Sequence, residues 1–269
     1  MLQLGGEKRE MTPFFSDIQG FSTISEGLTP EELVQLLNEY LTAMCGIISS
    51  HHGTIDKFEG DAIIAFWGAP LVLPEHATVA CYAAIEMQQR NEEMRQMLRE
   101  QNRPLLYTRM GLNSGPVVVG NMGSADRMDY TMMGDVVNLA ARLEGANKFY
   151  KTFTMVSGST YELAKDDIDS RQLDIIRVVG KKEPVHVYEV LARKNETGSE
   201  ISGVVEQYLK GLKLYQDRNF ADAVKEFKKV LDIDPEDGPS LTYVKRCSVF
   251  LETPPEKDWD GVYTFTEKG

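Results

Sequence analysis

The stretch Thr54–Trp67, TIDKFEGDAIIAFW, predicts two short strands joined by a tight turn. Residues 54–58 and 62–67 are rich in β-branched and aromatic residues, which favour strands. Gly60 lies between the two runs and supplies the backbone freedom that a hairpin turn requires. The segments on both sides extend this hairpin into a longer series of strands and helices.

A helix is predicted upstream of the hairpin, starting at Pro30. Thr29-Pro30-Glu31-Glu32 has the form of a capping box with proline at the first helical position. Apolar residues then recur every three or four positions until His51-His52-Gly53 ends the pattern. The other predicted elements are strands over 12–18, 106–113 and 116–120 and helices over 74–102 and 135–147, with the last two strands paired around Ser114-Gly115.

The order of the leading elements is βαββαβ, the split arrangement of the ferredoxin-like fold, with helices on one face of an antiparallel sheet. We therefore predict an α+β fold with this core, extended by extra strands and helices and followed by a small α-helical unit. Such a fold supports many functions. The function has to be inferred from individual side chains.

Composition and charge limit the class of protein. The 269 residues are 42% hydrophobic and 26% charged, as in soluble globular proteins, and the formal net charge is -12. A field of that sign repels phosphate backbones, so nucleic acid is not an expected partner. Three widely spaced cysteines suggest reduced thiols, and the chain shows neither an apolar run of membrane-spanning length nor a signal-peptide pattern. We expect a cytoplasmic location.

Two aspartates are candidates for a metal site. Asp17, in FSDIQGFS, ends a predicted strand before a glycine turn, and Asp61 lies at the tip of the 54–67 hairpin. In a ferredoxin-like sheet these strands are neighbours, so the two carboxylates can converge. Paired aspartates suit hard cations such as Mg²⁺, and two such ions can clamp the attacking and leaving oxygens of a phosphoryl displacement.

Four blocks of sequence carry a family resemblance. FSDIQGFS, KFEGDAIIAFWGAP, GLNSGPVVVGNMGS and DYTMMGDVVNLAARLE resemble the successive motifs of class III adenylyl and guanylyl cyclases, over about residues 5–191. The resemblance implies that Asp17 and Asp61 hold two divalent ions, Mg²⁺ or Mn²⁺ with Ca²⁺ as a further candidate, with the carbonyl of Ile18 as another ligand. It also implies a homodimer, because in this family the two halves of each active site come from different chains.

The resemblance assigns Lys57 and Thr131 to recognition of the purine. An ammonium group only donates hydrogen bonds, adenine N1 only accepts and guanine N1–H only donates, so Lys57 favours ATP. Thr131 places the chain in a threonine-type subgroup. A hydroxyl can accept from the adenine amino group or donate to guanine O6, so Thr131 alone discriminates poorly. A guanylate or relaxed-specificity cyclase therefore stays an alternative to an adenylate cyclase.

The resemblance also assigns catalytic and phosphate-binding side chains. Asn138 and Arg142, four apart on the 135–147 helix, match the pair that orients the ribose and stabilises charge on the α-phosphate. Arg109 and Lys181 match cationic positions that contact the β- and γ-phosphates, although Lys182 fits equally well on spacing alone. An inactive nucleotide-binding signalling scaffold is the alternative from another functional class.

The sequence after the cyclase-like region predicts a separate unit. We expect a catalytic domain over 1–194, a polar linker over 195–202 and a helical region over 203–269. Gly211, Ala223, Phe227 and Pro235 have the separations of a tetratricopeptide repeat. One repeat cannot bury its own apolar face, so it is expected to pack on the same chain. Similar tails in bacterial cyclases that are anchored in a membrane imply an upstream sensor.

Overall fold

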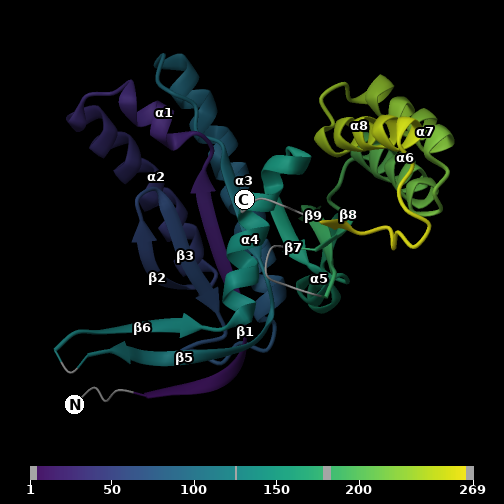
Figure 1. Ribbon diagram of the computed structural model, residues 1–269. Coiled ribbons are helices and arrows are strands. Elements are labelled where there is room, and N and C mark those ends of the chain that lie inside the picture. The colour runs from purple at the N-terminus through teal and green to yellow at the C-terminus, as the bar shows by residue number, and fades with distance from the viewer. Residues whose placement is uncertain (1–4, 125, 178–182, 265–269) are drawn as a thin grey trace.

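The computed structural model describes residues 5–124, 126–177 and 183–264 (Figure 1). Its helices are α1 (Phe21–Glu26), α2 (Pro30–Ser50), α3 (His76–Glu100), α4 (Asp135–Tyr150), α5 (Gly158–Ala164), α6 (Ser199–Gln216), α7 (Phe220–Ile233) and α8 (Gly238–Glu252). Its strands are β1 (Gly5–Ile18), β2 (Thr54–Glu59), β3 (Ala62–Trp67), β4 (Thr108–Leu112), β5 (Gly115–Gly123), β6 (Met128–Met133), β7 (Thr154–Ser157), β8 (Ile168–Arg177), β9 (Val185–Arg193) and β10 (Tyr263–Thr264). Each helix and strand predicted from the sequence is present, with shifted ends.

The central sheet confirms the predicted ferredoxin-like core. β1 lies between β3 and β4, with β2 beyond β3, and all of these pairs are antiparallel. Helices α2 and α3 cover the face that carries Met110 and Leu112, whereas α4 packs on the opposite face. Gly111 permits this close approach, since a Cβ there would lie 2.1 Å from the backbone nitrogen of Glu144. Helices therefore cover both faces of the sheet, whereas the sequence predicted helices on one face only.

Helix α2 begins as the sequence predicts. The Thr29 side chain accepts a hydrogen bond from the Glu32 backbone, and the Glu32 carboxylate accepts one from the Thr29 N–H. This capping box satisfies two amide groups that would otherwise lack partners at the start of the helix. The buried face then runs through Leu36, Tyr40 and Met44 against the sheet.

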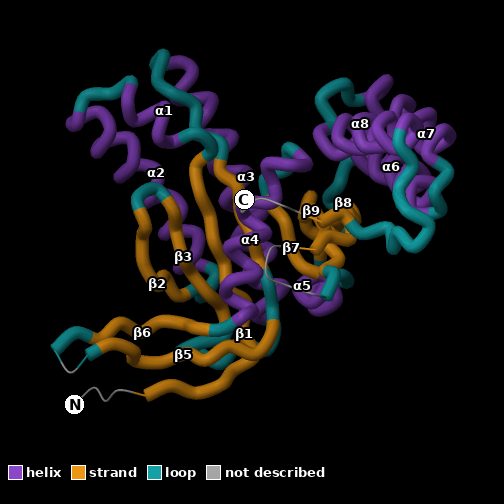
Figure 2. The backbone as a smooth tube through the Cα atoms, viewed as in Figure 1, coloured by secondary structure: helices purple, strands orange, loops and turns teal. Residues whose placement is uncertain are grey.

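Strand β1 is longer than the strand predicted over residues 12–18. Its first half pairs with β5, from Gly5 opposite Asn121 to Met11 opposite Gly115, and its second half pairs with β3 and β4. The predicted pairing of 106–113 with 116–120 is therefore wrong, because β4 and β5 pair with β1 and not with each other. The start of β1, β5 and β6 form a ribbon that extends away from the main sheet (Figure 2).

The junction between β4 and β5 explains the wrong prediction. Ser114 does not lie in an exposed hairpin turn but is buried, with its hydroxyl 2.8 Å from that of Thr12 and 2.9 Å from that of Thr160. These contacts join residues far apart in the chain. Gly120 also permits a close approach to β1, since a Cβ there would lie 2.1 Å from the Gly5 carbonyl oxygen.

Helices α6, α7 and α8 form a unit beside β8 and α4 (Figure 1). Helix α6 already begins at Ser199, inside the segment predicted as a linker. Gly211 of α6 faces the ring of Phe227 on α7, where a Cβ would lie 2.8 Å from the ring. Two residues of the predicted repeat thus pack together, and the assignment as a tetratricopeptide-like repeat stays a prediction.

This helical unit packs on the same chain, as expected. The hydroxyls of Tyr208 and Tyr243 both donate to the Leu173 carbonyl of β8, at 2.9 Å each. Arg246 of α8 forms an ion pair of 2.5 Å with Asp174 of β8, and both side chains are at least nine-tenths buried. A second buried pair, at 2.6 Å, joins Arg171 of β8 to Asp237 at the start of α8. The helices are therefore attached to the sheet by buried polar contacts.

Candidate active site

Asp17 and Asp61 meet at one end of the central strands. Asp17 is the penultimate residue of β1. Asp61 follows Gly60, which adopts a φ of +66° at the tip of the β2–β3 hairpin. The backbone N–H of Ile18 donates a hydrogen bond of 2.9 Å to Oδ2 of Asp61. The structure thus brings together the two carboxylates singled out in the sequence, and the role predicted for the Ile18 carbonyl stays a prediction.

The surroundings of these carboxylates suit a cation. Burial, and then the neighbouring charge of Asp17, raise the pKa of Asp61 to about 6, although the Ile18 N–H lowers it. Two carboxylates at one half-buried place ionise together more readily when a cation offsets their repulsion. Carboxylate oxygens are ligands that Mg²⁺ prefers, so the donor set fits a divalent ion. Within the described ranges no three His, Cys, Asp or Glu side chains are grouped to hold a metal ion, so further ligands would be backbone, water or substrate oxygens.

Arg109 connects this pair to helix α4. It lies opposite Asp17 in the pairing of β1 with β4, and its Nη2 donates to Oδ2 of Asp17 at 3.2 Å. Its Nε lies 3.0 Å from Oε1 of Glu144, as an ion pair without hydrogen-bond alignment. Glu144 was not predicted as a site residue. The available signal was Gly111, because a glycine inside a strand often marks a close approach of another backbone.

The carboxyl group of Glu144 makes stability depend on pH. Burial raises its pKa from 4.5 to about 7, Arg109 lowers it in part, and Asp17 raises it further. Since the folded state binds this proton more tightly than the unfolded state, the stabilisation is complete below pH 4.5 and is lost as the pH rises through 7. We expect the metal-free wild type to lose about 1 to 3 kcal/mol of unfolding free energy over this range relative to Glu144→Gln.

Urea unfolding, followed by circular dichroism at several pH values, measures this difference. The control is Glu93→Gln, because the Glu93 side chain is 64% exposed and its loss should leave the wild-type pH dependence unchanged. Parallel curves for wild type and Glu144→Gln would contradict the expected titration.

Lys57 and Thr131 come together around a third residue, Asp56. The Thr131 hydroxyl on β6 donates to Oδ2 of Asp56 at 2.7 Å, and the Lys57 ammonium lies 3.5 Å from Oδ1. The pairing of β2 with β3 shifts between Ile55 and Lys57, so Asp56 lies in a β-bulge. Bulges redirect side chains near active sites. Strict alternation along β2 predicts opposite faces for Asp56 and Lys57, so the sequence offered no signal for this cluster.

Asn138 and Arg142 lie in the first half of α4, with Asn138 exposed and Arg142 half-buried. Among the described residues, no hydrogen bond or ion pair joins either of them to Asp17 or Asp61. The described part of a single chain therefore does not bring the predicted catalytic pair into contact with the carboxylates. Lys181, predicted to bind phosphate, and the equally spaced Lys182 lie outside the described residues.

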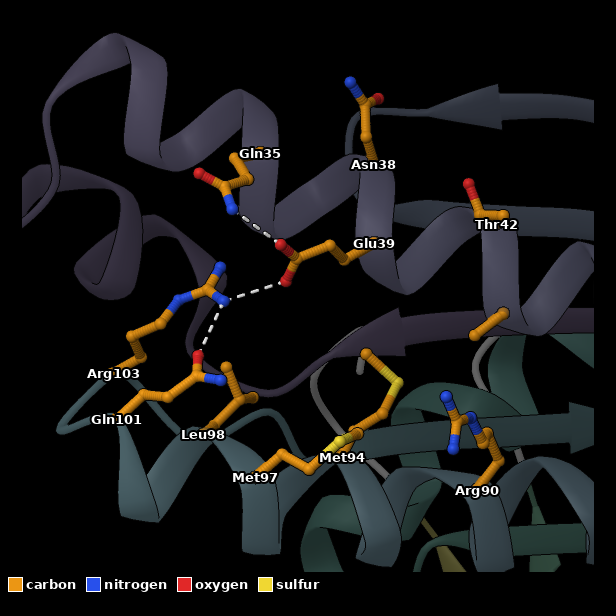
Figure 3. Close-up of a pocket in the computed structure, with 11 residues that line it drawn as sticks. Gln35, Asn38, Glu39, Thr42, Arg90, Met94, Met97, Leu98, Gln101 and Arg103 are labelled. Carbon is orange, nitrogen blue, oxygen red and sulfur yellow. Dashed lines mark hydrogen bonds and ion pairs between the residues drawn. The ribbon is translucent and has the colours of Figure 1, made fainter.

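A groove of about 730 Å³ between α2 and α3 contains none of the predicted site residues. The Gln35 amide and the Arg103 guanidinium donate to the two oxygens of Glu39, at 2.8 and 2.9 Å, over a floor that includes Met94 and Leu98 (Figure 3). Glu39 and Arg103, two of the charged residues that line the groove, thus pair with each other. The predicted site is found at the strand ends and not in this groove.

Comparisons of this chain with known proteins all indicate the same family. The adenylate and guanylate cyclase catalytic domain matches residues 6–192. Adenylate cyclase 1 of Rhizobium meliloti is 40% identical over 184 residues, which cover 68% of this chain and 28% of that protein. The adenylate cyclase of Dictyostelium discoideum that is specific for terminal differentiation is 32% identical over 250 residues, covering 91% of this chain and 12% of that protein. The chain thus spans well under half the length of these relatives.

Solved structures agree with this result. The adenylyl cyclase CyaB from P. aeruginosa aligns with a TM-score of 0.66 and 40% identity over 72% of this chain and 100% of that chain. The guanylyl cyclase Cya2 aligns with a TM-score of 0.65 and 36% identity over 72% and 98%. No helix in the described part of the chain is long and apolar enough to cross a membrane. By sequence and by structure, this chain belongs to the family of adenylate and guanylate cyclase catalytic domains.

Proposed function

We propose that this domain is an adenylate cyclase, which converts ATP to 3',5'-cyclic AMP and pyrophosphate in signal transduction. The observation that carries the proposal is the convergence of Asp17 and Asp61 beside Arg109 in a member of the cyclase family. Relatives named as adenylate cyclases support ATP as the substrate. The guanylyl cyclase Cya2 is also similar, so a guanylate or relaxed-specificity cyclase is the alternative.

Asp17 and Asp61 would hold two divalent ions, Mg²⁺ or Mn²⁺, with the Ile18 carbonyl as a further ligand. Such ions, when bound, would make the ribose 3'-hydroxyl more acidic and offset the charge of the triphosphate. The protein itself fixes the positions of the two carboxylates. The Ile18 N–H holds the Asp61 carboxylate in place through its 2.9 Å hydrogen bond, and Arg109 does the same for Asp17.

The reaction itself needs electrostatic stabilisation more than covalent chemistry. The 3'-hydroxyl loses its proton to water and its oxygen bonds to the α-phosphorus, while the bond from that phosphorus to the oxygen that bridges it to the β-phosphorus breaks and pyrophosphate leaves. Arg142 would stabilise the negative charge that develops on the α-phosphate, and Asn138 would orient the ribose. Arg109 and Lys181 would bind the β- and γ-phosphates.

We further propose a homodimer in which each site takes Asp17 and Asp61, with Ile18 and Arg109 beside them, from one protomer and Lys57, Thr131, Asn138 and Arg142 from the partner. This arrangement is supported by the lack of contacts between Asn138 or Arg142 and the carboxylates within one described chain. A two-fold axis would then generate two equivalent sites. Dimer formation would be a condition for activity.

An assay of ATP and GTP side by side tests this proposal. The purified domain should form cyclic AMP with Mg²⁺ or Mn²⁺, lose this activity on chelation and regain it when the metal is returned. GTP should be used less well by at least the roughly 5- to 150-fold that Lys57 contributes, because its ammonium group leaves guanine N1–H opposite another donor. Chromatography of both products measures the ratio.

Comparable rates with the two nucleotides would contradict the assignment to ATP. Undetectable product from dimeric protein loaded with metal would instead support the inactive nucleotide-binding scaffold. The described helices α6 to α8 would then be the natural candidate for its working surface.

The domain boundaries and the tail complete the proposal. We assign residues 1–194 to a catalytic domain, which is followed by a tetratricopeptide-like region whose helices α6 to α8 dock on β8 and α4. The Thr242 hydroxyl of α8 donates to the Phe149 carbonyl of α4 at 2.8 Å, which supports a role of this region in holding α4. A cytoplasmic location and an upstream membrane sensor belong to the same proposal.

A further inference from the structure

We propose that Asp56 sets the base specificity of the site by holding the Thr131 hydroxyl as a hydrogen-bond acceptor toward the purine. Asp56 is a positioning residue, since it would act through Thr131. The inference rests on the proposed function, in which Thr131 and Lys57 recognise the base. It changes the expectation for Thr131 from a neutral residue to one that selects adenine.

The contact that carries the inference is short and buried. The Thr131 Oγ1 lies 2.7 Å from Oδ2 of Asp56. The Asp56 side chain is only 3% exposed, and its Oδ1 is buried without a hydrogen-bond partner among the described residues. Water therefore has little access to compete for this carboxylate. The β-bulge at Asp56 holds the carboxylate toward β6, the strand that carries Thr131.

Counting hydrogens decides what Thr131 can offer to a ligand. A threonine hydroxyl has one hydrogen and two lone pairs, whereas an ionised carboxylate has no hydrogen to give. In the contact with Asp56, the hydroxyl must therefore be the donor. Its single hydrogen is used, and only its lone pairs remain for the purine.

A hydroxyl that can only accept distinguishes the two purines. The 6-amino group of adenine donates hydrogen bonds, so it can pair with the Thr131 oxygen. The O6 of guanine only accepts, so two acceptors would face each other. Lys57 discriminates in the same sense at N1, because its ammonium group only donates. Its ion pair with Asp56, at 3.5 Å, is longer than a hydrogen bond and leaves its hydrogens available for N1.

The test replaces Asp56 with asparagine. The amide can donate to the Thr131 oxygen and so release the hydroxyl hydrogen toward guanine O6. We expect the preference for ATP over GTP in kcat/KM to fall by roughly 5- to 150-fold in Asp56→Asn. Asp56→Ala also frees the hydroxyl, so it should shift the preference in the same direction and serves if Asp56→Asn does not fold.

Two comparisons separate positioning of Thr131 from a general structural effect. In a Thr131→Val background the hydroxyl is absent, so Asp56→Asn should cause no further change in base preference. The matched control is Asp167→Asn, because Asp167 accepts a comparable hydrogen bond from Thr78, at 3.2 Å, away from the site. This variant should keep the wild-type preference.

Binding of 3'-deoxy-ATP and 3'-deoxy-GTP provides a readout that does not need turnover, since neither has the attacking hydroxyl. If Asp56→Asn loses the same preference in binding, the inference is supported even when the protein forms no cyclic nucleotide. A lack of cyclic nucleotide would refute only the proposed function. An unchanged preference in both folded Asp56 variants would overturn the inference. An equal effect of Asp56→Asn with and without the Thr131 hydroxyl would overturn it too.

Discussion

Mixing Asp17→Ala protein with Arg142→Ala protein is expected to restore cyclase activity that neither variant has alone. Loss of the Asp17 carboxylate would remove a proposed ligand of the divalent ions, and loss of Arg142 would remove the proposed charge stabilisation at the α-phosphate. Each homodimer should therefore lose on the order of 10²- to 10³-fold in kcat or more. In the mixed dimer one site contains both lesions, while the other combines intact carboxylates with an intact Arg142.

The amount of recovered activity is predictable. Random exchange of equal amounts should give about half heterodimers, each with one intact site of two, and so about a quarter of wild-type activity. Two different affinity tags allow the heterodimer to be isolated and assayed for product. The control mixes Asp17→Ala with Asp61→Ala, because both lesions lie in the same half of the site and no intact site can form. Recovery in this control, or none from the isolated first heterodimer, would contradict a site shared between two chains.

Replacing Arg246 with methionine is expected to destabilise the protein by about 3 to 5 kcal/mol. The Arg246–Asp174 pair of 2.5 Å is buried, with the side chains 10% and 2% exposed. Without Arg246, Asp174 is a buried charge whose described partners are the Tyr150 hydroxyl, at 2.6 Å, and the Ile175 amide, at 2.7 Å. The cost comes from that remaining charge more than from the lost attraction.

Chemical unfolding followed by fluorescence and circular dichroism measures this loss. The matched control is Lys213→Met, which removes an exposed pair with Asp217 on the same helical unit and should cost less than about 0.5 kcal/mol. Adding Asp174→Asn to Arg246→Met should recover part of the stability, because the buried charge is removed. Similar small losses for Arg246→Met and Lys213→Met would show that the buried pair does not hold the helical unit on the sheet.

Local signals predicted most of the fold. The Thr29 to Glu32 capping box defined the start of α2, and Gly60 marked the tip of the β2–β3 hairpin, because both features depend on neighbouring residues. The pairing of β5 was predicted wrongly, because a junction at Ser114 looks like a turn until its distant partners Thr12 and Thr160 are known.

The same distinction applies to the candidate site. Asp17, Asp61, Lys57 and Thr131 could be singled out from short motifs, since the chemistry of a carboxylate, an ammonium group or a hydroxyl belongs to the residue itself. The residues that contact the site residues could not be singled out from such motifs. Glu144 reaches Arg109 only because α4 packs closely on Gly111, a contact between separate elements.

The sequence by itself therefore determined the types of helix and strand, the cyclase-like motifs and the residues that we propose to bind metal, phosphate and base. Only the tertiary structure decided that Thr131 donates its hydrogen to Asp56, which lies 75 positions earlier in the chain. Motifs are local, whereas the orientation of a hydroxyl depends on whichever strand folds beside it. For this protein, that difference separates a threonine with no evident preference from one that is set to accept a hydrogen bond from adenine.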